Sequence, residues 1–556
     1  MKLSTSVFII HVIITASLSF LPVVSYTQTL SINEFMASNG STIADENGDF
    51  EDWIELHNYG DESIHLEGWF LSDDLSDPYK WLFPDTVIHP AEFLLVWASG
   101  KDRIENTLHT NFSIDASGEE LLLVHPLGNW VDVVNPIAVP RDISYGRKPD
   151  GAGGWFYFDE PTPQLPNVTE GFYGILPPPE FSHPGGFYDE EFLLEIMHSD
   201  SEAVIYYTLD GSEPDAGNTA GTTYVFKNQY PENPGDTPGE FLTASFTSHI
   251  FEQSLSIKNR SPEADSLTQI SSTWHFNPGY FPEQPVTKGT VVRARAVKDG
   301  FLASPVITHT FFVKNPGKNY YSLPVLSLST NEANLFDYEQ GVYVAGVDFD
   351  TWRLNNPDTE PNWNIGANFN RSGVDWEFTC HIEFFENNGS LGFNQDIGFR
   401  IHGGSSRTLP AKSFRLYARN RYGNELINYP VFKEEKLDSF KRLILRNSGQ
   451  DWQSALFRDP AIQHIVKHLK FDTQAHRPLI LFINGEYWGI FNFRERYDKH
   501  YLARVHDVDE NNLDIVTNYY TADEGDMENI NALFDYFDEH DFSLNENYAF
   551  AKSHID

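Results

Sequence analysis

Short apolar runs separated by turn residues about every ten positions most limit how this chain can fold. Within one such run, Trp53, Ile54 and Leu56 alternate partly with Glu55 and His57, which predicts a half-buried strand. Glycine (38 residues) and proline (32 residues) supply the turns, and aromatic residues (15%) can fill the cores. The pattern therefore predicts a mainly β protein built from β-sandwich modules.

The length of the chain and its single cysteine add two limits. A chain of 556 residues is too long for one core, and domains of about 100–200 residues predict three or four of them. Cys380 is the one cysteine, so the chain forms no internal disulfide and no cysteine metal cluster. Packing alone must therefore hold the domains together.

The charge of the chain is strongly negative. It has 38 Lys and Arg against 80 Asp and Glu, for a formal net charge of −42. Such a surface repels nucleic acid and anionic lipid, so we expect neither as a partner. The acidic residues are scattered, which argues against a disordered acidic tail. We interpret the negative net charge as a property that keeps the protein soluble, and an acidic recognition surface is the alternative.

The first 25 residues read as a secretory signal peptide. Lys2 gives the positive start, an apolar run extends from Val7 to Val24, and Ser25 ends a small-residue cleavage site. The alternative is an uncleaved membrane anchor, which Pro22 and the polar interruptions weaken. We expect a secreted or cell-surface protein that has no membrane contact after cleavage.

Residues 30–167 form the first predicted domain. They contain, in order, INEFMASN, DWIELHN, LEGWFLSDD, HTNFSIDASGEELLLVHPLG, ISYGRKPDG and EPTPQLPN. This series resembles a lamin-tail domain. The resemblance implies an immunoglobulin-like β-sandwich that serves as a binding or spacer unit and has no catalytic centre.

The loop at residues 45–52 is rich in acidic residues. An EF-hand loop that begins at Asp45 requires glycine at its sixth position and glutamate at its twelfth. Phe50 and Leu56 occupy those positions. We therefore predict a solvated acidic turn, and a calcium site of another kind is the alternative.

Residues 177–315 form the second predicted domain. A proline-rich hinge precedes YYTLDGSEP, and VRARAVKDGF follows much later. These two blocks resemble the β-sandwich appended to chitobiases and β-hexosaminidases. The resemblance implies an accessory module, for which binding of a glycan or cell-wall polymer is an open alternative. Between Ala216 and Pro285 lies a polar insertion, which we predict to be an elaborated surface loop.

Residues 321–556 combine alternating strands with one amphipathic helix and a hairpin. The helix is predicted from DPAIQHIVKHL, and its apolar face consists of Ile462, Ile465, Val466 and Leu469. The hairpin turns at Asn484 and Gly485. Strands, a helix and then a hairpin follow one another in the order of a kinase amino-terminal lobe, which gives this segment an α+β character.

The segment from Arg400 to Phe414 carries the chemistry that we predict. Gly403 and Gly404 let backbone amides approach an anion, and the hydroxyls of Ser405 and Ser406 add donors. Three cations accompany them in an acidic chain, namely Arg400, Arg407 and Lys412. The pattern predicts a phosphate cradle. It matches neither a P-loop nor the glycine loop of protein kinases, and the alternative is a glycine turn whose cations pair with local carboxylates.

Together with LILRNSGQDW, FRD and FINGEYWGIFNFRERYDKHYL, this segment resembles the kinase domain of the CotH spore-coat family. The resemblance implies phosphorylation of serines on exported or cell-surface proteins, with ATP and Mg²⁺ as cofactors. The residues that it implies for the nucleotide are Arg400, Gly403, Gly404, Ser405, Ser406, Arg407, Lys412 and Glu495. For Glu495 the alternative is an ion pair with Arg494 or Arg496.

The resemblance also implies that the catalytic carboxylates and the metal ligands follow a helix similar to NYAFAKSHID, and therefore lie beyond Asp556. We expect an incomplete kinase-like domain and a fragment of a longer kinase that is inactive by itself. A naturally truncated lobe is one alternative. Another is a non-catalytic extracellular protein that adheres to surfaces or binds carbohydrate.

Overall fold

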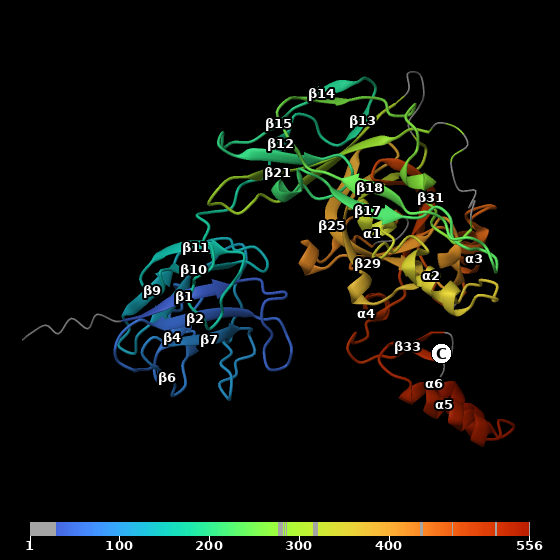
Figure 1. Cartoon of the computed structure of the whole chain (residues 1–556). Coiled ribbons are helices and arrows are strands. Elements are labelled where there is room, and N and C mark those ends of the chain that lie inside the picture. The colour runs from blue at the N-terminus through green and yellow to red at the C-terminus, as the bar shows by residue number, and fades with distance from the viewer. Residues whose placement is uncertain are drawn as a thin grey trace, which may run out of the picture. The chain divides into compact units, whose positions relative to one another are not determined.

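A computed structural model describes residues 29–554 except 276–281, 283, 285, 315–320, 434–436, 470, 518 and 519. The predicted signal peptide and Asp556 lie outside the described residues. The chain divides into two compact units, with the boundary after Gly171 (Figure 1). Strands far outnumber helices among the described residues, which confirms the prediction of a mainly β protein with a terminal α+β region.

The first unit is a sandwich of antiparallel sheets. One sheet has the order β11-β10-β1-β2-β7 and another the order β5-β4-β8-β9, while β3 pairs with β6. The strands are β1 (Leu30–Met36), β2 (Asp52–Asn58), β3 (Ile64–His65), β4 (Phe70–Ser72), β5 (Trp81–Leu82), β6 (Val87–Ile88), β7 (Phe93–Ala98), β8 (Leu121–Val124), β9 (Trp130–Val134), β10 (Ser144–Lys148) and β11 (Gly154–Phe158).

The prediction that β2 is a half-buried strand is wrong. Glu55 and His57, the residues expected to face solvent, are 0% and 7% exposed. The strand is central in its sheet, and the segment after β11 covers its second face, where the amide of Gln164 donates to Glu55 Oε2 over 2.5 Å. A periodicity of two cannot reveal this cover, because a loop from 109 residues away supplies it.

The second unit begins with a further sandwich. Its main sheet has the order β13-β22-β21-β16-β19, and three two-stranded sheets accompany it, β12-β15, β14-β20 and β17-β18. The strands are β12 (Glu180–Phe181), β13 (Gly186–Tyr188), β14 (Phe192–Leu194), β15 (Ile196–Met197), β16 (Val204–Thr208), β17 (Thr222–Phe226), β18 (Leu242–Phe246), β19 (His249–Ile250), β20 (Leu255–Ile257), β21 (Gly289–Val297) and β22 (Ile307–Val313).

Seven strands of the same unit close into a barrel of order β23-β24-β25-β26-β29-β31-β30. Closure depends on one parallel pair, in which Val325 of β23 lies opposite Ile480 of β30. The strands are β23 (Val325–Ser329), β24 (Phe378–Phe385), β25 (Leu391–His402), β26 (Ser413–Tyr417), β29 (Arg442–Arg446), β30 (His476–Ile483) and β31 (Glu486–Glu495), beside the small pairs β27 (Ile427–Asn428) with β28 (Ser439–Phe440) and β32 (Ile515–Thr517) with β33 (Thr521–Glu524).

Helices occur around the barrel and after it. They are α1 (Glu332–Phe336), α2 (Gly346–Asn355), α3 (Arg458–Val466), α4 (Lys499–His506), α5 (Glu528–Glu539) and α6 (Asn545–His554). The predicted helix is α3, yet Ile462, Ile465 and Leu469 of its apolar face are 54%, 68% and 47% exposed. None of the helices in the described ranges has both the length and the apolar character needed to cross a bilayer.

The predicted turn at Asn484 meets the turn at Asp210 and Gly211 where the second sandwich joins the barrel. Asn484, in the turn between β30 and β31, donates through Nδ2 to the carbonyl of Asp210 over 2.8 Å. A Cβ on Gly211, whose φ is +85°, would lie 2.3 Å from the Asn484 side chain. The close approach therefore requires glycine at this position. Phe312 of β22 also packs into a cluster with Phe385 and Phe482 of the barrel, so the sandwich and the barrel share a core.

The prediction that the insertion after Ala216 is a surface loop is wrong. Tyr224, Leu267 and Ile270 from this insertion pack into the core of the barrel. Glu486 accepts hydrogen bonds from the backbone amides of Leu267 and Thr268, both over 3.1 Å. Residues 216–275 of the insertion therefore form a strap, a few of whose apolar residues belong to the barrel's hydrophobic core. Its polar composition conceals the few apolar residues that make these contacts.

Candidate functional site

The candidate site is a cavity of about 500 Å³ beside the loop between β25 and β26. Three barrel strands begin or end at this point: His402 ends β25, Ser413 begins β26 and Arg446 ends β29. All three residues line the cavity. Loops at strand ends can vary without disturbing the ladder, so a barrel commonly carries its binding groups there.

The backbone of the loop faces the cavity at its two glycines. Gly403 has a φ of +119°, and a Cβ there would lie 2.3 Å from the Ser406 Oγ. A Cβ on Gly404 would meet no atom within 4 Å, so this residue faces open space. Gly403, Gly404 and Ser406 all line the cavity. The predicted turn thus places main-chain groups and one of the two predicted hydroxyls at the cavity wall.

Arginines make this cavity electropositive. Arg415, Arg446 and Arg496 line it, and each comes from a different strand or strand end. Burial, together with the repulsion of the neighbouring arginines, lowers the pKa of His402 to about 3. His402 is therefore neutral, and its Nδ1 accepts from Arg415 Nε over 2.9 Å, which leaves the ring proton on Nε2. A neutral imidazole beside three guanidinium groups favours an anionic ligand.

Two of the predicted cations lie within the loop instead of at the cavity. Lys412 is fully buried, and its Nζ donates to the carbonyls of Arg407 and Leu409 over 2.6 and 2.9 Å. Arg407 Nε donates to the Gly403 carbonyl over 2.6 Å, and its Nη1 donates to the carbonyl of Arg371 over 3.2 Å. Both side chains stabilise the loop through hydrogen bonds to its backbone carbonyls, and neither lines the cavity.

The predicted residue Arg400 also has its partner elsewhere. Its Nη2 lies 2.6 Å from Glu377 Oε2, and Arg419 and Arg421 bind the same carboxylate. Burial would raise the pKa of Glu377, but the three guanidinium groups outweigh it and hold this pKa below its ordinary value. Ser405 lies in the short helix η5 (Ser405–Thr408), is exposed and is not part of the cavity lining.

Glu495 is buried at the end of β31. Its Oε1 lies 2.7 Å from Arg504 Nη2 of α4, and its Oε2 accepts from the amide of Ala475 over 3.0 Å. The ion pair is thus with Arg504, which the sequence argument did not consider. Glu495 does not line the cavity, although the next residue, Arg496, does. The role that the family resemblance implies for Glu495 stays a prediction.

The residues that sequence reasoning missed are Arg415, Arg446 and Arg496. Arg446 and Arg496 stand in blocks that carried the family resemblance, LILRNSG and FNFRERY, and Arg415 directly follows the segment from Arg400 to Phe414. The available signal for Arg446 and Arg496 was an arginine at the end of a predicted strand; Arg415, in the middle of β26, carried no such signal. The signal was missed because a sequence does not show which arginines meet around one cavity and which pair with carboxylates such as Glu377.

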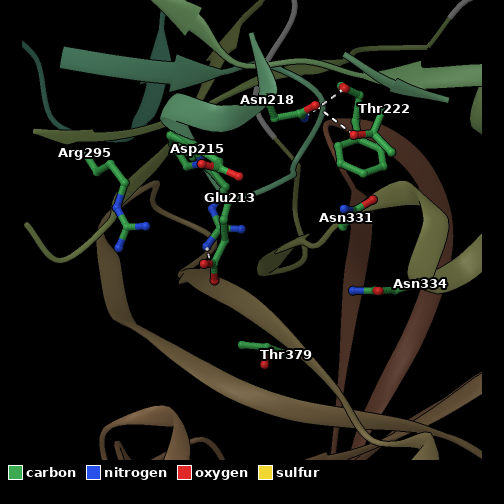
Figure 2. A pocket seen from close by; sticks show the side chains of 11 residues that line it. Glu213, Asp215, Asn218, Thr222, Arg295, Asn331, Asn334 and Thr379 are labelled. Carbon is green, nitrogen blue, oxygen red and sulfur yellow. Dashed lines mark hydrogen bonds and ion pairs between the residues drawn. The ribbon is translucent and has the colours of Figure 1, made fainter. Parts of the chain in front are cut away.

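A second cavity of about 440 Å³ lies between the second sandwich and the barrel (Figure 2). Its wall is polar and includes Arg293 and Arg295 from β21 and Asn331 and Asn334 from the start of α1. No prediction from the sequence pointed to it, because the two parts of its wall come from segments that the sequence assigned to different domains.

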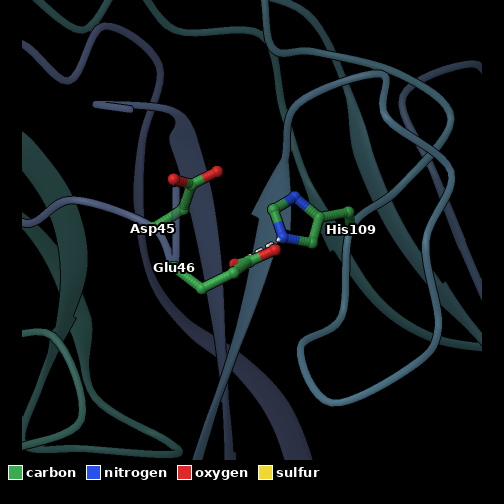
Figure 3. Close-up of side chains that lie close together, drawn as sticks. All are labelled: Asp45, Glu46 and His109. Carbon is green, nitrogen blue, oxygen red and sulfur yellow. Dashed lines mark hydrogen bonds and ion pairs between the residues drawn. The ribbon is translucent and has the colours of Figure 1, made fainter. Parts of the chain in front are cut away.

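The acidic loop of the first unit brings together residues that could hold a metal, in two groups. Asp45, Glu46 and His109 form one group, and Figure 3 shows Glu46 facing the His109 ring, with Oε2 at 3.1 Å from Nε2. The second group is Asp45 with Asp49 and Glu51.

Lysine and arginine side chains of the protein already form ion pairs with the carboxylates of both groups. Lys101 Nζ lies 2.6 Å from Asp45 and 2.9 Å from both Asp49 and Glu51, while Arg103 Nη1 lies 3.0 Å from Glu46. Burial would raise the pKa of Asp45, but Lys101 and two backbone amides lower it to about 2. The loop is thus a salt-bridged turn that satisfies its own charges.

Comparison with known protein families gives three matches. Residues 399–553 match the family described as CotH kinase protein, residues 24–138 match the Lamin Tail Domain, and residues 194–311 match the family described as Fn3 associated. The carboxyl-terminal segment is CotH-like. The matches fall on the three predicted segments in the predicted order, which confirms that layout. A search of the curated proteins finds no match.

Proposed function

We propose that the CotH-like segment binds ATP in the cavity beside Gly403 and Gly404, and that it serves an exported protein kinase that phosphorylates serine on secreted or cell-surface proteins. The observation that carries the proposal is the gathering of Arg415, Arg446 and Arg496 around this glycine turn in a chain of net charge −42. The family match covers the turn and all three arginines.

The groups at the cavity fit a nucleotide. Guanidinium groups bind phosphate oxygens in pairs of parallel hydrogen bonds, and open glycine amides add donors that no side chain obstructs. Tyr497 and Ile444 line the same cavity and offer an aromatic ring and an aliphatic face to a base. These residues would hold the triphosphate at the loop and the base near Tyr497.

The fit to Mg²⁺ is poor. Among the described residues that line the cavity, Asp523 is the one carboxylate, and its Oδ2 lies 3.1 Å from Arg496 Nη2. A protein site for Mg²⁺ uses one or two carboxylates together with phosphate oxygens. Because Asp523 is already paired with a cation, we assign no metal ligand, and the proposal rests on nucleotide binding alone.

The test is calorimetric titration of the protein with ATP. Arg446→Gln removes one guanidinium contact with phosphate, which is worth about 1.5–3 kcal/mol and corresponds to an affinity roughly ten to a hundred times weaker. Arg419→Gln is the matched control, since Arg419 lies two residues after β26, pairs with Glu377 and does not line the cavity. We expect wild-type affinity for this control.

The result that overturns the proposal is an absence of ATP binding, or an equal loss of affinity in both variants. Transfer of labelled phosphate from ATP to serine in a mixture of secreted proteins tests the kinase step separately. If ATP binds without transfer, the segment is a nucleotide-binding module and the kinase part of the proposal is wrong.

A further inference from the structure

The cavity between the second sandwich and the barrel has the features of a ligand site. One wall comes from β21 and the turn after β16, and the other from the start of α1 and from Thr379 of β24 (Figure 2). The packing of Phe312 against Phe385 and Phe482, and the bond from Asn484 to Asp210, fix these walls relative to one another. The cavity is therefore preformed, as small-molecule sites commonly are.

Two arginines from one strand supply positive charge to this cavity. Arg293 is 3% exposed, and its Nε and Nη1 donate to Thr308 Oγ1 and the Gly211 carbonyl over 3.1 and 3.0 Å. These bonds lock the guanidinium, and its Nη2 has Glu213 Oε1 at 3.7 Å, beyond hydrogen-bond distance. Burial lowers the pKa of Arg293 from its ordinary value, although it stays cationic at neutral pH.

Arg295 has even fewer partners. Its Nε donates to the Ser304 carbonyl over 3.3 Å, and its two Nη atoms make no hydrogen bond or ion pair with any described residue. An arginine without a carboxylate partner is unexpected in a chain with 80 acidic and 38 basic residues. Arg293 Nη2 and the Arg295 fork are thus available to one anionic group of a ligand.

Uncharged donors and acceptors surround these cations. Asn331 Oδ1 accepts from the amide of Ala333 over 2.9 Å, which leaves its Nδ2 without a partner among the described residues. Asn334 Nδ2 donates to Thr330 Oγ1 over 3.1 Å, and the Asn334 Oδ1 has no partner among the described residues. One amide thus offers donors and the other an acceptor, and the Thr379 side chain also lines the cavity. Such alternation suits a row of ligand hydroxyls, each of which both donates and accepts.

The remaining lining residues limit the charge and shape of the ligand. Glu213 and Asp215 balance the two arginines, so a ligand with several negative charges, such as a phosphate ester, would meet carboxylates. Phe246 gives an aromatic face that can cover the C–H face of a sugar ring. We propose that this cavity binds a carbohydrate that carries one carboxylate, a uronic-acid residue of a glycan. The proposal does not depend on nucleotide binding in the other cavity.

Calorimetric titration of the full chain with three probes tests this inference: methyl β-D-glucuronide, methyl β-D-glucoside and sodium acetate. We expect binding of the glucuronide, at least tenfold weaker binding of the glucoside and no binding of acetate. Arg295→Gln should weaken binding of the glucuronide at least tenfold. Arg419→Gln is the control, because Arg419 lines neither cavity.

Four results would each overturn the inference. They are no binding of the glucuronide, equal binding of acetate, equal binding of the glucoside, and unchanged affinity in Arg295→Gln. Thr379→Val is a second variant in case Arg295→Gln fails to fold, since Thr379 is exposed and its replacement removes one hydroxyl without a change of charge. Saturating ATP should leave the affinity for the glucuronide unchanged, so this test and the nucleotide test can fail independently.

Discussion

Lys412 stabilises the loop between β25 and β26 as a buried residue. Its ammonium group donates to two loop carbonyls and lies 4.3 Å from the centre of the Phe369 ring. Burial lowers the pKa of Lys412 well below its ordinary value, and Arg407 lowers it further. A donor in this position satisfies the carbonyls of Arg407 and Leu409, which would otherwise be buried without donors.

We therefore predict that Lys412→Met destabilises the fold. The free energy of unfolding should fall by about 2–4 kcal/mol, because two buried carbonyls lose their donor while most of the side-chain volume remains. Affinity for ATP should fall in parallel as the loop loosens. Thermal unfolding measured beside ATP titration checks this, with Arg446→Gln as the comparison that weakens ATP binding without a change in melting temperature.

The outcome that contradicts this prediction is a Lys412→Met protein that melts like the wild type and binds no ATP. Lys412 would then contact the phosphates directly, as the family resemblance implies.

The sequence could predict the glycine turn and Ser406, because their role depends on local backbone. It could not rank six nearby cations, because ranking them requires knowledge of partners such as Glu377 and Leu409, which the fold alone supplies.

At the scale of elements, the strap from the second sandwich reaches the same loop. Ser272 Oγ donates to the carbonyl of Pro410 over 2.8 Å. Two residues later, Trp274 packs near Phe369, with ring centres 6.2 Å apart, and Phe369 lies against Lys412. The strap thus contacts the loop through residues that do not line the cavity. A domain that looks separate in sequence contributes to the position of the predicted nucleotide loop.

We predict that Ser272→Ala speeds hydrogen exchange in the loop. Loss of one neutral hydrogen bond to a buried carbonyl costs about 1 kcal/mol, so amides from Gly403 to Leu409 should exchange roughly five times faster. Exchange measured by mass spectrometry on the full chain checks this. Leu242→Ala is the control in the same strap, because Leu242 is 41% exposed and should leave exchange in the loop unchanged. Equal exchange in Ser272→Ala and wild type would show that the strap does not support the loop.

Elements with local signals were predicted well. The hairpin turn at Asn484 and Gly485 is confirmed, with φ values of +47° and +83° that suit this residue pair. Closure of the barrel was not predictable, because its parallel pair joins Val325 to Ile480, which is 155 positions later in the chain. No local pattern encodes such a pairing. The strap was hidden for the same reason, since its contacts with Glu486 span more than 200 residues.

At the scale of the whole molecule, the first unit has a stability that should depend on pH. The first unit encloses two glutamates from neighbouring strands, Glu34 and Glu55, which lie opposite each other in the β1–β2 ladder and are both fully buried. Burial raises the pKa of Glu34 to about 7 and that of Glu55 to about 8, and the repulsion of Glu34 contributes to the shift of Glu55. Hydrogen bonds from Ser144 and Asn33 reduce these shifts without cancelling them.

This pair predicts that the first unit loses stability as the pH rises. A carboxyl whose pKa is raised by folding contributes its full stability below its unfolded pKa of 4.5, and loses it as the pH passes the folded value. Between pH 5 and pH 9 the free energy of unfolding of this unit should therefore fall, by about 3 kcal/mol for Glu34 alone. Proteolysis pulses in increasing urea, with mass spectrometry of peptides from β1 and β2, measure this stability in the full chain.

Glu34→Gln should flatten this pH dependence. The glutamine oxygen can accept hydrogen bonds from Ser144 and Thr162, as Glu34 Oε1 does. The glutamine nitrogen can donate to the Thr162 hydroxyl, which lies 3.4 Å from Glu34 Oε2. The glutamine side chain does not ionise. The variant should be more stable than wild type at pH 9, and Glu55 should titrate lower because its charged neighbour is gone. Glu67→Gln, at an exposed position of the same unit, should keep the wild-type slope. If wild type and Glu34→Gln show the same slope, Glu34 has the same pKa in the folded and unfolded states, and the prediction of a raised pKa is wrong.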